Sequence, residues 1–366
     1  MKSSHHPTSI CRALLTAGLL VSLVTGCTVV GPTAIRSGRL AYNEAITETN
    51  NQQMLMILVN NRYEERGSML AVTSVTANVS VITTAGVQLG FGDSDNYGNN
   101  LVPFNAGAIY EENPTISYTP VTGEKYARYL MSPLPVHVLA QLTGTMANPA
   151  PIYTALVANV NGIHNPDFRF TSIEPDPRFE RFVELMTALT RAQCLHWVED
   201  PERSGDFSIV ISHHAPVYAD QVSELLDLLG LPAPQDRTAR VILPVSLALD
   251  GRDTGGIGII TYTVFDLVEI LSAAIEVPEE DQRNGVSTSY PPPGLAGRTL
   301  RVPYSKARPE QAAVAVKHRD GWFYIDEKDK ATKGFFRLLA SLWSVSIAES
   351  TAKTTAAPVL TVPVSR

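Results

Sequence analysis

Apolar and polar residues alternate with period two between residues 75 and 81, and after residues 83–86 the same phase resumes between residues 87 and 91. The apolar residues of this stretch occupy its odd positions: Val75, Ala77, Val79, Val81, Val87, Leu89 and Phe91. A second alternating stretch, 116–119, follows a Gly- and Asn-rich loop at residues 92–100. Because successive side chains of a strand point to opposite faces, the pattern predicts an antiparallel meander with one dry and one wet face.

The same alternation is typical of membrane-inserting hairpins in oligomeric pores, whose arms need about 9–11 residues. The cleanly alternating part of the first arm is shorter than this, and no aromatic girdle brackets both of its ends. An ordinary half-buried sheet is therefore the favoured interpretation. A pore hairpin is the alternative.

Helical periodicity dominates much of the remaining chain. Residues 40–65 contain neither Pro nor Gly, and Met54, Leu55, Leu58 and Val59 are spaced to form one face. Further helices are predicted at 126–142, interrupted by Pro133 and Pro135, and at 151–160, 178–193, 217–229 and 265–274. Strands are predicted at 207–212, 241–249 and 257–263. The sequence thus predicts an α+β fold, in which antiparallel sheet elements pack with several helices.

The C-terminal region predicts a compact hairpin, helix and strand. Residues 312–318 and 322–325 flank Arg319-Asp320-Gly321, in which Asp-Gly is the turn signal. One helical stripe follows, formed by Phe336, Leu339, Ala340, Trp343 and Ile347. Residues 358–364 are apolar enough for a buried or edge strand. We expect this unit to belong to the core rather than to a ligand site.

The N-terminal 26 residues predict a cleaved secretory signal peptide. Lys2 and Arg12 are basic, and the apolar run from Ala13 to Val24 is too short to cross a bilayer of about 30 Å. The run ends in Val24-Thr25-Gly26-Cys27, which resembles the bacterial lipobox. The thiol of Cys27 is therefore the predicted lipid attachment site, carrying palmitate among its acyl chains. The alternative is an ordinary signal peptide with an incidental cysteine.

Several acyl chains on one residue predict permanent membrane anchorage, since a single chain binds only marginally. Thr28 follows the cysteine, where an aspartate would resemble the inner-membrane retention signal. We therefore expect the periplasmic face of the outer membrane, with surface exposure as an alternative. Residues 27–38 form the lipid anchor and tether, 39–283 the main α+β domain, and 284–366 the C-terminal unit, which either stands alone or packs on the same core.

The net charge of the chain argues against a nucleic acid as its partner. The chain has 29 basic and 36 acidic residues and a formal net charge of −7. Removing residues 1–26 takes away two basic residues and no acidic one, so the mature chain carries −9. A nucleic-acid-binding protein normally has the opposite sign or a basic face, and the sequence indicates neither.

Several segments resemble an uncharacterised family of Gram-negative envelope lipoproteins with an N-terminal lipobox. Besides the lipobox, they are Ala41-Tyr42-Asn43, PTISYTPVTGEKY at 114–126, VNGIHNP at 160–166, WFYIDEKDKATKGFF at 322–336 and APVLTVPV at 357–364. The resemblance spans most of the mature chain and implies one evolved unit. It implies no activity.

Signatures of catalysis and of metal binding are missing from the sequence. The sequence has no G-x-S-x-G, H-E-x-x-H or Walker A motif, and no S-x-x-K followed by K-T-G. Gly255-Gly256-Ile257-Gly258 precedes a predicted strand, whereas a dinucleotide loop follows one, so a turn is predicted. The histidines of the mature chain are scattered: His137, His164, His196, His213, His214 and His318. We therefore predict no catalytic residue, no metal site and no cofactor.

Three further groups have structural explanations that outweigh functional ones. Cys194 lies in an apolar segment and is expected to be a buried, inert thiol. The segment 93–98 opens like a calcium loop, but Phe104 stands where a bidentate Glu is required. Asp326 and Asp329 precede a predicted helix, where carboxylates stabilise the helix dipole, so capping is favoured over acid–base catalysis.

Taken together, these features predict a non-catalytic envelope component that binds or assembles with other envelope proteins. The loops at 92–114 and 276–297 are the expected contact sites, because loops tolerate variation and carry recognition. Two alternatives stay open: a subunit of an oligomeric outer-membrane pore or export complex, and an enzyme of unrecognised type. The sequence does not indicate an oligomeric state.

Overall fold

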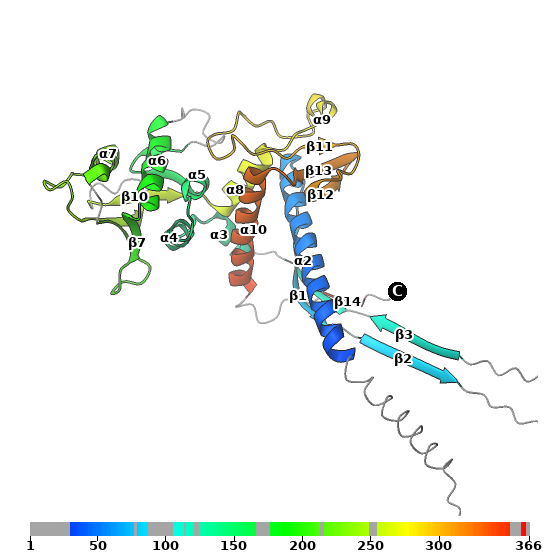
Figure 1. Cartoon of the computed structure of the whole chain (residues 1–366). Helices are drawn as coiled ribbons and strands as arrows, with labels where there is room; N and C mark the ends of the chain where they lie inside the picture. The colour runs from blue at the N-terminus through cyan, green and yellow to red at the C-terminus, as the bar shows by residue number, and fades with distance from the viewer. Residues whose placement is uncertain are drawn as a thin grey trace, which may run out of the picture. The chain divides into compact units, whose positions relative to one another are not determined.

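The computed structural model describes residues 30–76, 79–86, 105–112, 115–120, 124–165, 176–212, 216–248, 255–351 and 360–363. The chain divides into two compact units. Unit 1 comprises residues 1–50, 70–120 and 356–366, and unit 2 comprises residues 51–69 and 121–355. Helices and mostly antiparallel sheets alternate along the chain, which confirms the predicted α+β class (Figure 1).

The first described element is the long helix α2, Val30–Arg62. It covers most of the predicted helix at 40–65 and begins earlier. The predicted apolar face is confirmed, because Met54, Leu55, Leu58 and Val59 are all buried in unit 2. Burial of this face, rather than helix propensity alone, stabilises the C-terminal half of α2.

The described strands of unit 1 are antiparallel, as predicted, but they do not pair in the order of a meander, because the first strand pairs with the fourth and the second with the third. The strands are β1 Leu70–Thr76, β2 Val79–Gly86, β3 Asn105–Glu112, β4 Thr115–Pro120 and β14 Leu360–Pro363. One sheet has the order β1-β4-β14, and β2 and β3 form a two-stranded sheet. The prediction of a polar loop at 92–114 is wrong for residues 105–112, which pair with β2 over their whole length. Val87, Leu89 and Phe91 lie outside the described residues.

Unit 2 is built on a six-stranded sheet of order β6-β5-β10-β9-β8-β7. All neighbouring strands are antiparallel except β9 and β10. The strands are β5 Val157–Val160, β6 Ile163–His164, β7 Leu195–Glu199, β8 Phe207–Ile211, β9 Val241–Leu247 and β10 Ile257–Thr261. The interspersed helices are α3 Glu124–Met131, α4 Val136–Thr145, α5 Ala150–Leu156, α6 Pro177–Arg191 and α7 Ala219–Leu228, which follows the 3-10 turn η2 Pro216–Tyr218.

The predicted helix at 151–160 is wrong in its second half. Helix α5 ends at Leu156, and Val157–Val160 forms β5, which pairs with β10. Both halves are almost uniformly apolar and buried, so neither the helical nor the strand period appears in them. Pairing with β10, which lies about a hundred residues further along the chain, decides the conformation.

The glycine-rich segment before β10 is a turn, as predicted. Gly255 has a positive φ of 66°, a conformation that other residues rarely adopt. A side chain on Gly256 would overlap the carbonyl group of Pro244 in β9. The close approach of β9 to the start of β10 therefore accounts for the second glycine.

The C-terminal part of unit 2 contains the predicted hairpin and helix. Its elements are α8 Val264–Ala273, α9 Glu279–Arg283, β11 Tyr304–Ser305, β12 Ala312–His318, β13 Gly321–Asp326 and α10 Lys330–Thr351. The turn differs from the prediction, because Gly321 already pairs with His318 and the central residues are Arg319 and Asp320. Gly321 is explained by the Tyr304 ring, which a side chain at this position would overlap.

The predicted apolar stripe of the last helix is buried where it is described. Phe336, Leu339 and Trp343 are 5%, 0% and 4% exposed, and Ala340 is half-buried. The side chain of Ile347 lies outside the described residues. The stripe therefore belongs to the core of unit 2, as predicted.

The segment 276–297 is less free than a recognition loop is expected to be. Its start and its middle are held by backbone hydrogen bonds from Glu276 N–H to the Val302 carbonyl at 2.9 Å and from Thr288 N–H to the Arg62 carbonyl at 2.8 Å. Val277 is buried, and α9 lies within the segment. A local pattern of Pro and Gly does not reveal hydrogen-bond partners that lie far away in the sequence.

Among the described residues, no helix combines the length and the apolar character needed to cross a membrane.

Candidate functional site

The residues with catalytic or metal-binding chemistry do not converge in the described part of the chain. Cys194 is buried as predicted, and burial raises the pKa of its thiol. His137, His164 and His196 are exposed, and no group of three metal-ligating side chains occurs among the described residues. Cys27, Asp93–Gly98, Phe104, His213 and His214 lie outside those residues.

Of the two aspartates before α10, Asp329 acts as the predicted cap, whereas Asp326 bonds within the turn that precedes the helix. Asp329 accepts hydrogen bonds from the backbone N–H of Thr332 at 3.0 Å and from its hydroxyl at 2.6 Å. Asp326 accepts one from the backbone N–H of Lys328 at 2.7 Å. The bonds of Asp329 satisfy a donor in the first turn of the helix, and the bond of Asp326 stabilises the turn between β13 and α10, which gives both carboxylates a structural role.

A cluster of polar and aromatic side chains, which we call the Tyr63 cluster, joins distant segments of unit 2. The Tyr63 hydroxyl donates to the carboxylate of Asp281 at 2.7 Å, and its ring packs against those of His318 and Phe323. The Arg319 guanidinium lies 4.6 Å from the Tyr63 ring centroid. Burial, together with the bond to Asp281, raises the pKa of Tyr63 above its usual value.

Glu65 is the partly exposed carboxylate of this cluster and contacts both His318 and Arg319. Its carboxylate accepts hydrogen bonds from Arg319 and contacts His318, each at 2.9 Å, and these contacts hold its pKa below the ordinary value of 4.5. Next to it, Arg62 lies over the Tyr290 ring, whose hydroxyl donates to Glu269 at 2.8 Å. The whole arrangement links α2, α8, α9 and the β12–β13 turn, and each contact serves packing between them.

We expect Glu65→Gln to destabilise the protein in a pH-dependent way. Because the folded-state pKa of Glu65 is lowered, its contribution is present above the ordinary pKa and is lost as the pH falls through the lowered value. The Glu65 side chain is 41% exposed, so the loss at pH 7 should not exceed about 1 kcal/mol. Urea unfolding at pH 7 and pH 3 measures it. Glu202→Gln, on an exposed turn, is the control. If Glu65→Gln and the wild type differ in stability as much at pH 3 as at pH 7, the lowered pKa of Glu65 is contradicted.

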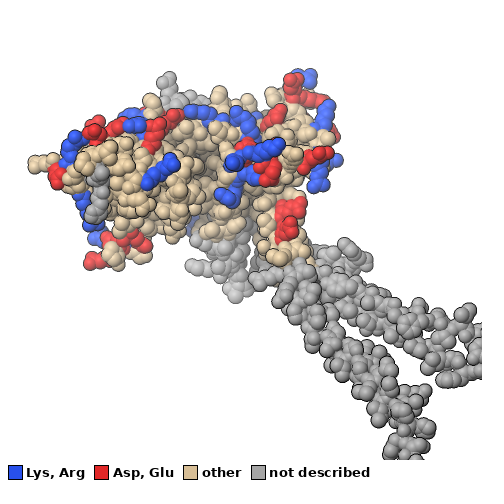
Figure 2. All heavy atoms as spheres, in the orientation of Figure 1, with Lys and Arg blue, Asp and Glu red and all other residues tan. Residues whose placement is uncertain are grey.

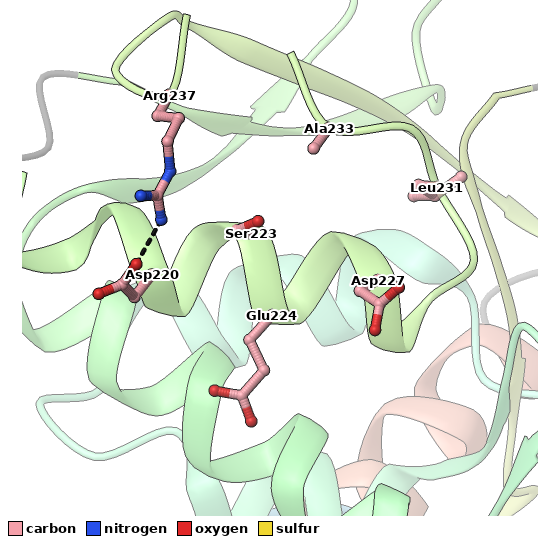
Figure 3. A pocket seen from close by; sticks show the side chains of 7 residues that line it. All are labelled: Asp220, Ser223, Glu224, Asp227, Leu231, Ala233 and Arg237. Atoms are coloured by element: carbon pink, nitrogen blue, oxygen red, sulfur yellow. Dashed lines mark hydrogen bonds and ion pairs between the residues drawn. The ribbon is translucent and has the colours of Figure 1, made fainter. Parts of the chain in front are cut away.

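A shallow depression of about 400 Å³ lies beside α7 (Figure 3). Its lining is mostly polar: Asp220, Ser223, Glu224, Asp227, Leu231, Ala233 and Arg237. Arg237 points to Asp220 and forms an ion pair with it, and Glu224 is paired with Arg181 at 2.6 Å. Two of its three carboxylates are thus neutralised by arginines, and it offers neither a nucleophile with a base nor an apolar floor for a ligand.

Charged residues are dispersed over the visible face of unit 2. Figure 2 shows Lys and Arg side chains interspersed with Asp and Glu on that face, with no large area of one sign among the described residues. An electrostatic docking surface is therefore not evident there.

The more distinctive feature is formed by the four strands β1, β2, β3 and β4 of unit 1, which we call the β1–β4 hairpin. Strands β1 and β2 are its first arm, and β3 and β4 are its second arm. In this hairpin Thr76 pairs with Thr115. Val79, three residues after Thr76, pairs with Glu112, three residues before Thr115. The β1–β4 pairs beyond the bulge at Val72/Ser74 and the β2–β3 pairs therefore share one register. A constant register keeps the same residues on the same face along both ladders.

The paired positions of this hairpin alternate in polarity. The odd positions of the first arm and their partners form the apolar face, with the pairs Val75–Ile116, Val79–Glu112, Val81–Tyr110, Thr83–Ala108 and Ala85–Ala106. The intervening pairs form the polar face: Ser74–Ser117, Thr76–Thr115, Ser80–Glu111, Ile82–Ile109, Thr84–Gly107 and Gly86–Asn105. The pattern is broken at three of the pairs, by Thr83 and Glu112 at apolar-face positions and by the Ile82–Ile109 pair at a polar-face position.

Strand β14 extends both faces. Leu360 pairs with Tyr118 and Val362 with Ile116, which adds two aliphatic residues to the apolar face, and Thr361 pairs with Ser117 on the polar face. Val75 and Ile116 are only half-buried, and none of the described side chains of unit 1 is buried. The described part of unit 1 therefore leaves apolar surface open to contact.

Sequence reasoning found the first arm of this hairpin and missed the second. Residues 105–112 alternate less clearly than the first arm because Gly107 and Glu112 interrupt the pattern. The apolar residues Ala106, Ala108 and Tyr110 do follow the period of two, and this signal could have identified the arm.

No protein-family model, curated protein or solved structure matches this chain.

Proposed function

We propose that this protein is a lipid-anchored component of the bacterial envelope that binds other envelope proteins through unit 1 and performs no catalysis. Cys27 holds it at the periplasmic face of the outer membrane. The observation that carries the proposal is the β1–β4 hairpin, whose apolar and polar faces persist in one register and whose described side chains are not buried. A two-faced sheet of this kind gains stability when a partner covers its apolar face.

Anchorage supports a binding function. A lipid-anchored protein shares a surface with every other membrane-bound protein, which raises its effective concentration toward them and makes weak contacts sufficient. In one form of this function the partners are further copies of the chain, as in an oligomeric outer-membrane pore or export complex. In the other form they are different envelope proteins. Crosslinking from unit 1 in cells tests the binding proposal: adducts are expected, and their absence contradicts it.

The anchor itself has a direct test. We expect Cys27→Ala to abolish incorporation of radiolabelled palmitate and to remove the protein from the membrane fraction, because the lipid supplies the attachment. Cys11→Ala and Cys194→Ala are the controls and should label like the wild type, since the first residue leaves with the signal peptide and the second is buried. Continued labelling of Cys27→Ala would refute the lipid attachment.

A further inference from the structure

The three-stranded sheet of order β11-β13-β12 has one face in the core and one face toward solvent. Buried and half-buried residues alternate along the central strand β13, so Phe323 and Ile325 lie in the core and Trp322 and Tyr324 lie on the opposite face. Residues directly opposite each other in a ladder share a face. We call the outer face the Trp322 face, which is formed by Ser305, Arg308, Ala315, Lys317, Trp322 and Tyr324.

The two aromatic side chains of the Trp322 face are half-buried and have available polar ends. They are two residues apart, which places them about 7 Å apart along the strand. Ser305 and Lys317 lie opposite Trp322, and the small Ala315 lies opposite Tyr324. Among the described residues, the Trp322 indole N–H and the Tyr324 hydroxyl have no hydrogen-bond partner. Because buried Trp and Tyr usually bond to the protein, these two groups are available to a ligand.

Two cations of the Trp322 face have no carboxylate partner in the described part of the chain. The Arg308 guanidinium lies 5.3 Å from the centroid of the Trp322 ring, and the exposed Lys317 lies opposite Trp322 in the ladder. Arg181 and Arg319, in contrast, each contact two carboxylates. Stacking on a ring uses the charge of a guanidinium and leaves its N–H donors available. The face therefore presents positive charge and hydrogen-bond donors to solvent.

These groups together fit a ligand of one chemistry. A sugar ring has C–H faces, which pack on the negative faces of aromatic rings, and hydroxyl groups around its rim, which accept hydrogen bonds from N–H and O–H donors. Carboxylates on a sugar chain would pair with the guanidinium and ammonium groups, and guanidinium–carboxylate pairs are commonly bidentate. An acidic glycan combines all three features.

The surrounding charges argue against a flat membrane surface as the occupant. Glu310, before β12, and Asp320, in the β12–β13 turn, are exposed, and Asp326 lies on the Trp322 face two residues beyond Tyr324. A bilayer with anionic headgroups would meet these carboxylates together with the cations, in a chain whose formal net charge is −7. A single glycan chain is narrow enough to meet the cations and rings alone.

We propose that the Trp322 face binds an acidic glycan of the cell envelope, with sugar rings packed on Trp322 and Tyr324 and carboxylates paired with Arg308 and Lys317. The inference goes beyond the proposed function, because it adds a second partner, bound by unit 2. It takes from that function only the envelope location, where glycans with carboxylate-bearing branches form the cell wall.

Cosedimentation with purified peptidoglycan tests the cations. The mature lipidated protein is used in a mild non-ionic detergent, and wild type is expected to sediment. Arg308→Gln/Lys317→Gln should bind at least about tenfold more weakly, because charge-assisted hydrogen bonds are lost. Lys330→Gln/Arg337→Gln removes two exposed charges from α10 and should bind like the wild type. No sedimentation of the wild type, or equal binding by the two double variants, would overturn the inference.

Tyr324→Thr tests the aromatic contact in the same assay. It should bind at least about threefold more weakly, because a sugar ring loses the ring on which it packs. Tyr129→Thr, whose ring on α3 is 37% exposed, is the control and should bind like the wild type. Circular dichroism checks that each variant is folded. Unchanged binding by folded Tyr324→Thr would overturn the inference, and the double variants decide if Tyr324→Thr does not fold.

Three soluble competitors separate the occupants. Glycan fragments that retain their acidic peptide branches should release the protein from peptidoglycan, whereas the same peptides without sugar and dihexanoyl phosphatidylglycerol should not. Equal release by the peptides or by the lipid would overturn the glycan in favour of an acidic peptide or a phospholipid headgroup. Crosslinking from unit 1 in cells should be the same in Arg308→Gln/Lys317→Gln as in the wild type, so the proposed function stands or fails separately.

Discussion

Replacing Trp343 with alanine is expected to lower the free energy of unfolding by about 3–5 kcal/mol, the range for emptying a site filled by a large buried aromatic residue. Trp343 is 4% exposed, and its indole N–H contacts the Met69 sulfur at 3.1 Å. Helix α10 packs against α3 and α8, and Leu339, one turn before Trp343, is fully buried. The substitution therefore removes apolar contacts and leaves a cavity that rigid neighbours cannot fill.

The matched control lies two residues further along the same helix. Val345 is 56% exposed, so Val345→Ala should change the free energy of unfolding by no more than about 0.5 kcal/mol, as is usual for surface substitutions. Urea unfolding followed by circular dichroism measures both variants. The slope of the free energy of unfolding against urea concentration checks that both expose the same surface on unfolding. Equal stabilities of Trp343→Ala and Val345→Ala would show that the tryptophan is not part of the core.

Elements with a clear period could be predicted from the sequence, because local patterning and tertiary burial agree in them. The apolar faces of α2 and α10 are the buried ones, and the alternation of 75–81 does form strands. Where nearly every residue is apolar or buried the pattern carries no period, so Val157–Val160 was predicted as helix although it pairs with β10. Strand β7, Leu195–Glu199, was not predicted either; it lies at the edge of the sheet, and only its first residue is buried, so no apolar run marks it as a strand.

The candidate binding surface could be predicted only in part. The first arm of the hairpin alternates cleanly, but its partner was predicted to be a loop because Gly107 and the glutamates of β3 weaken the pattern. The expectation of contact at 276–297 followed from its prolines and acidic residues. That segment is instead fixed by hydrogen bonds to Arg62 and Val302, partners that no local pattern specifies.

An enzyme of unrecognised type is the competing hypothesis, and it predicts a different response to mutation. A single substitution of one Asp, His or Ser would then abolish the cellular phenotype while leaving protein abundance and every crosslink unchanged. A binding protein should lose its phenotype and its crosslinks together, because both depend on the same surface.

Site-specific photo-crosslinking from Val75 in living cells tests the central claim most directly. A photoreactive amino acid replaces Val75, which lies on the apolar face and is half-buried, or Ser74, its exposed neighbour on the polar face. Val217 of unit 2, which is 73% exposed, is the control site. The proposal predicts a discrete protein adduct from position 75, and a much weaker one or none from positions 74 and 217. No adduct from position 75, or equal adducts from all three positions, would contradict the claim that unit 1 binds its partners through its apolar face.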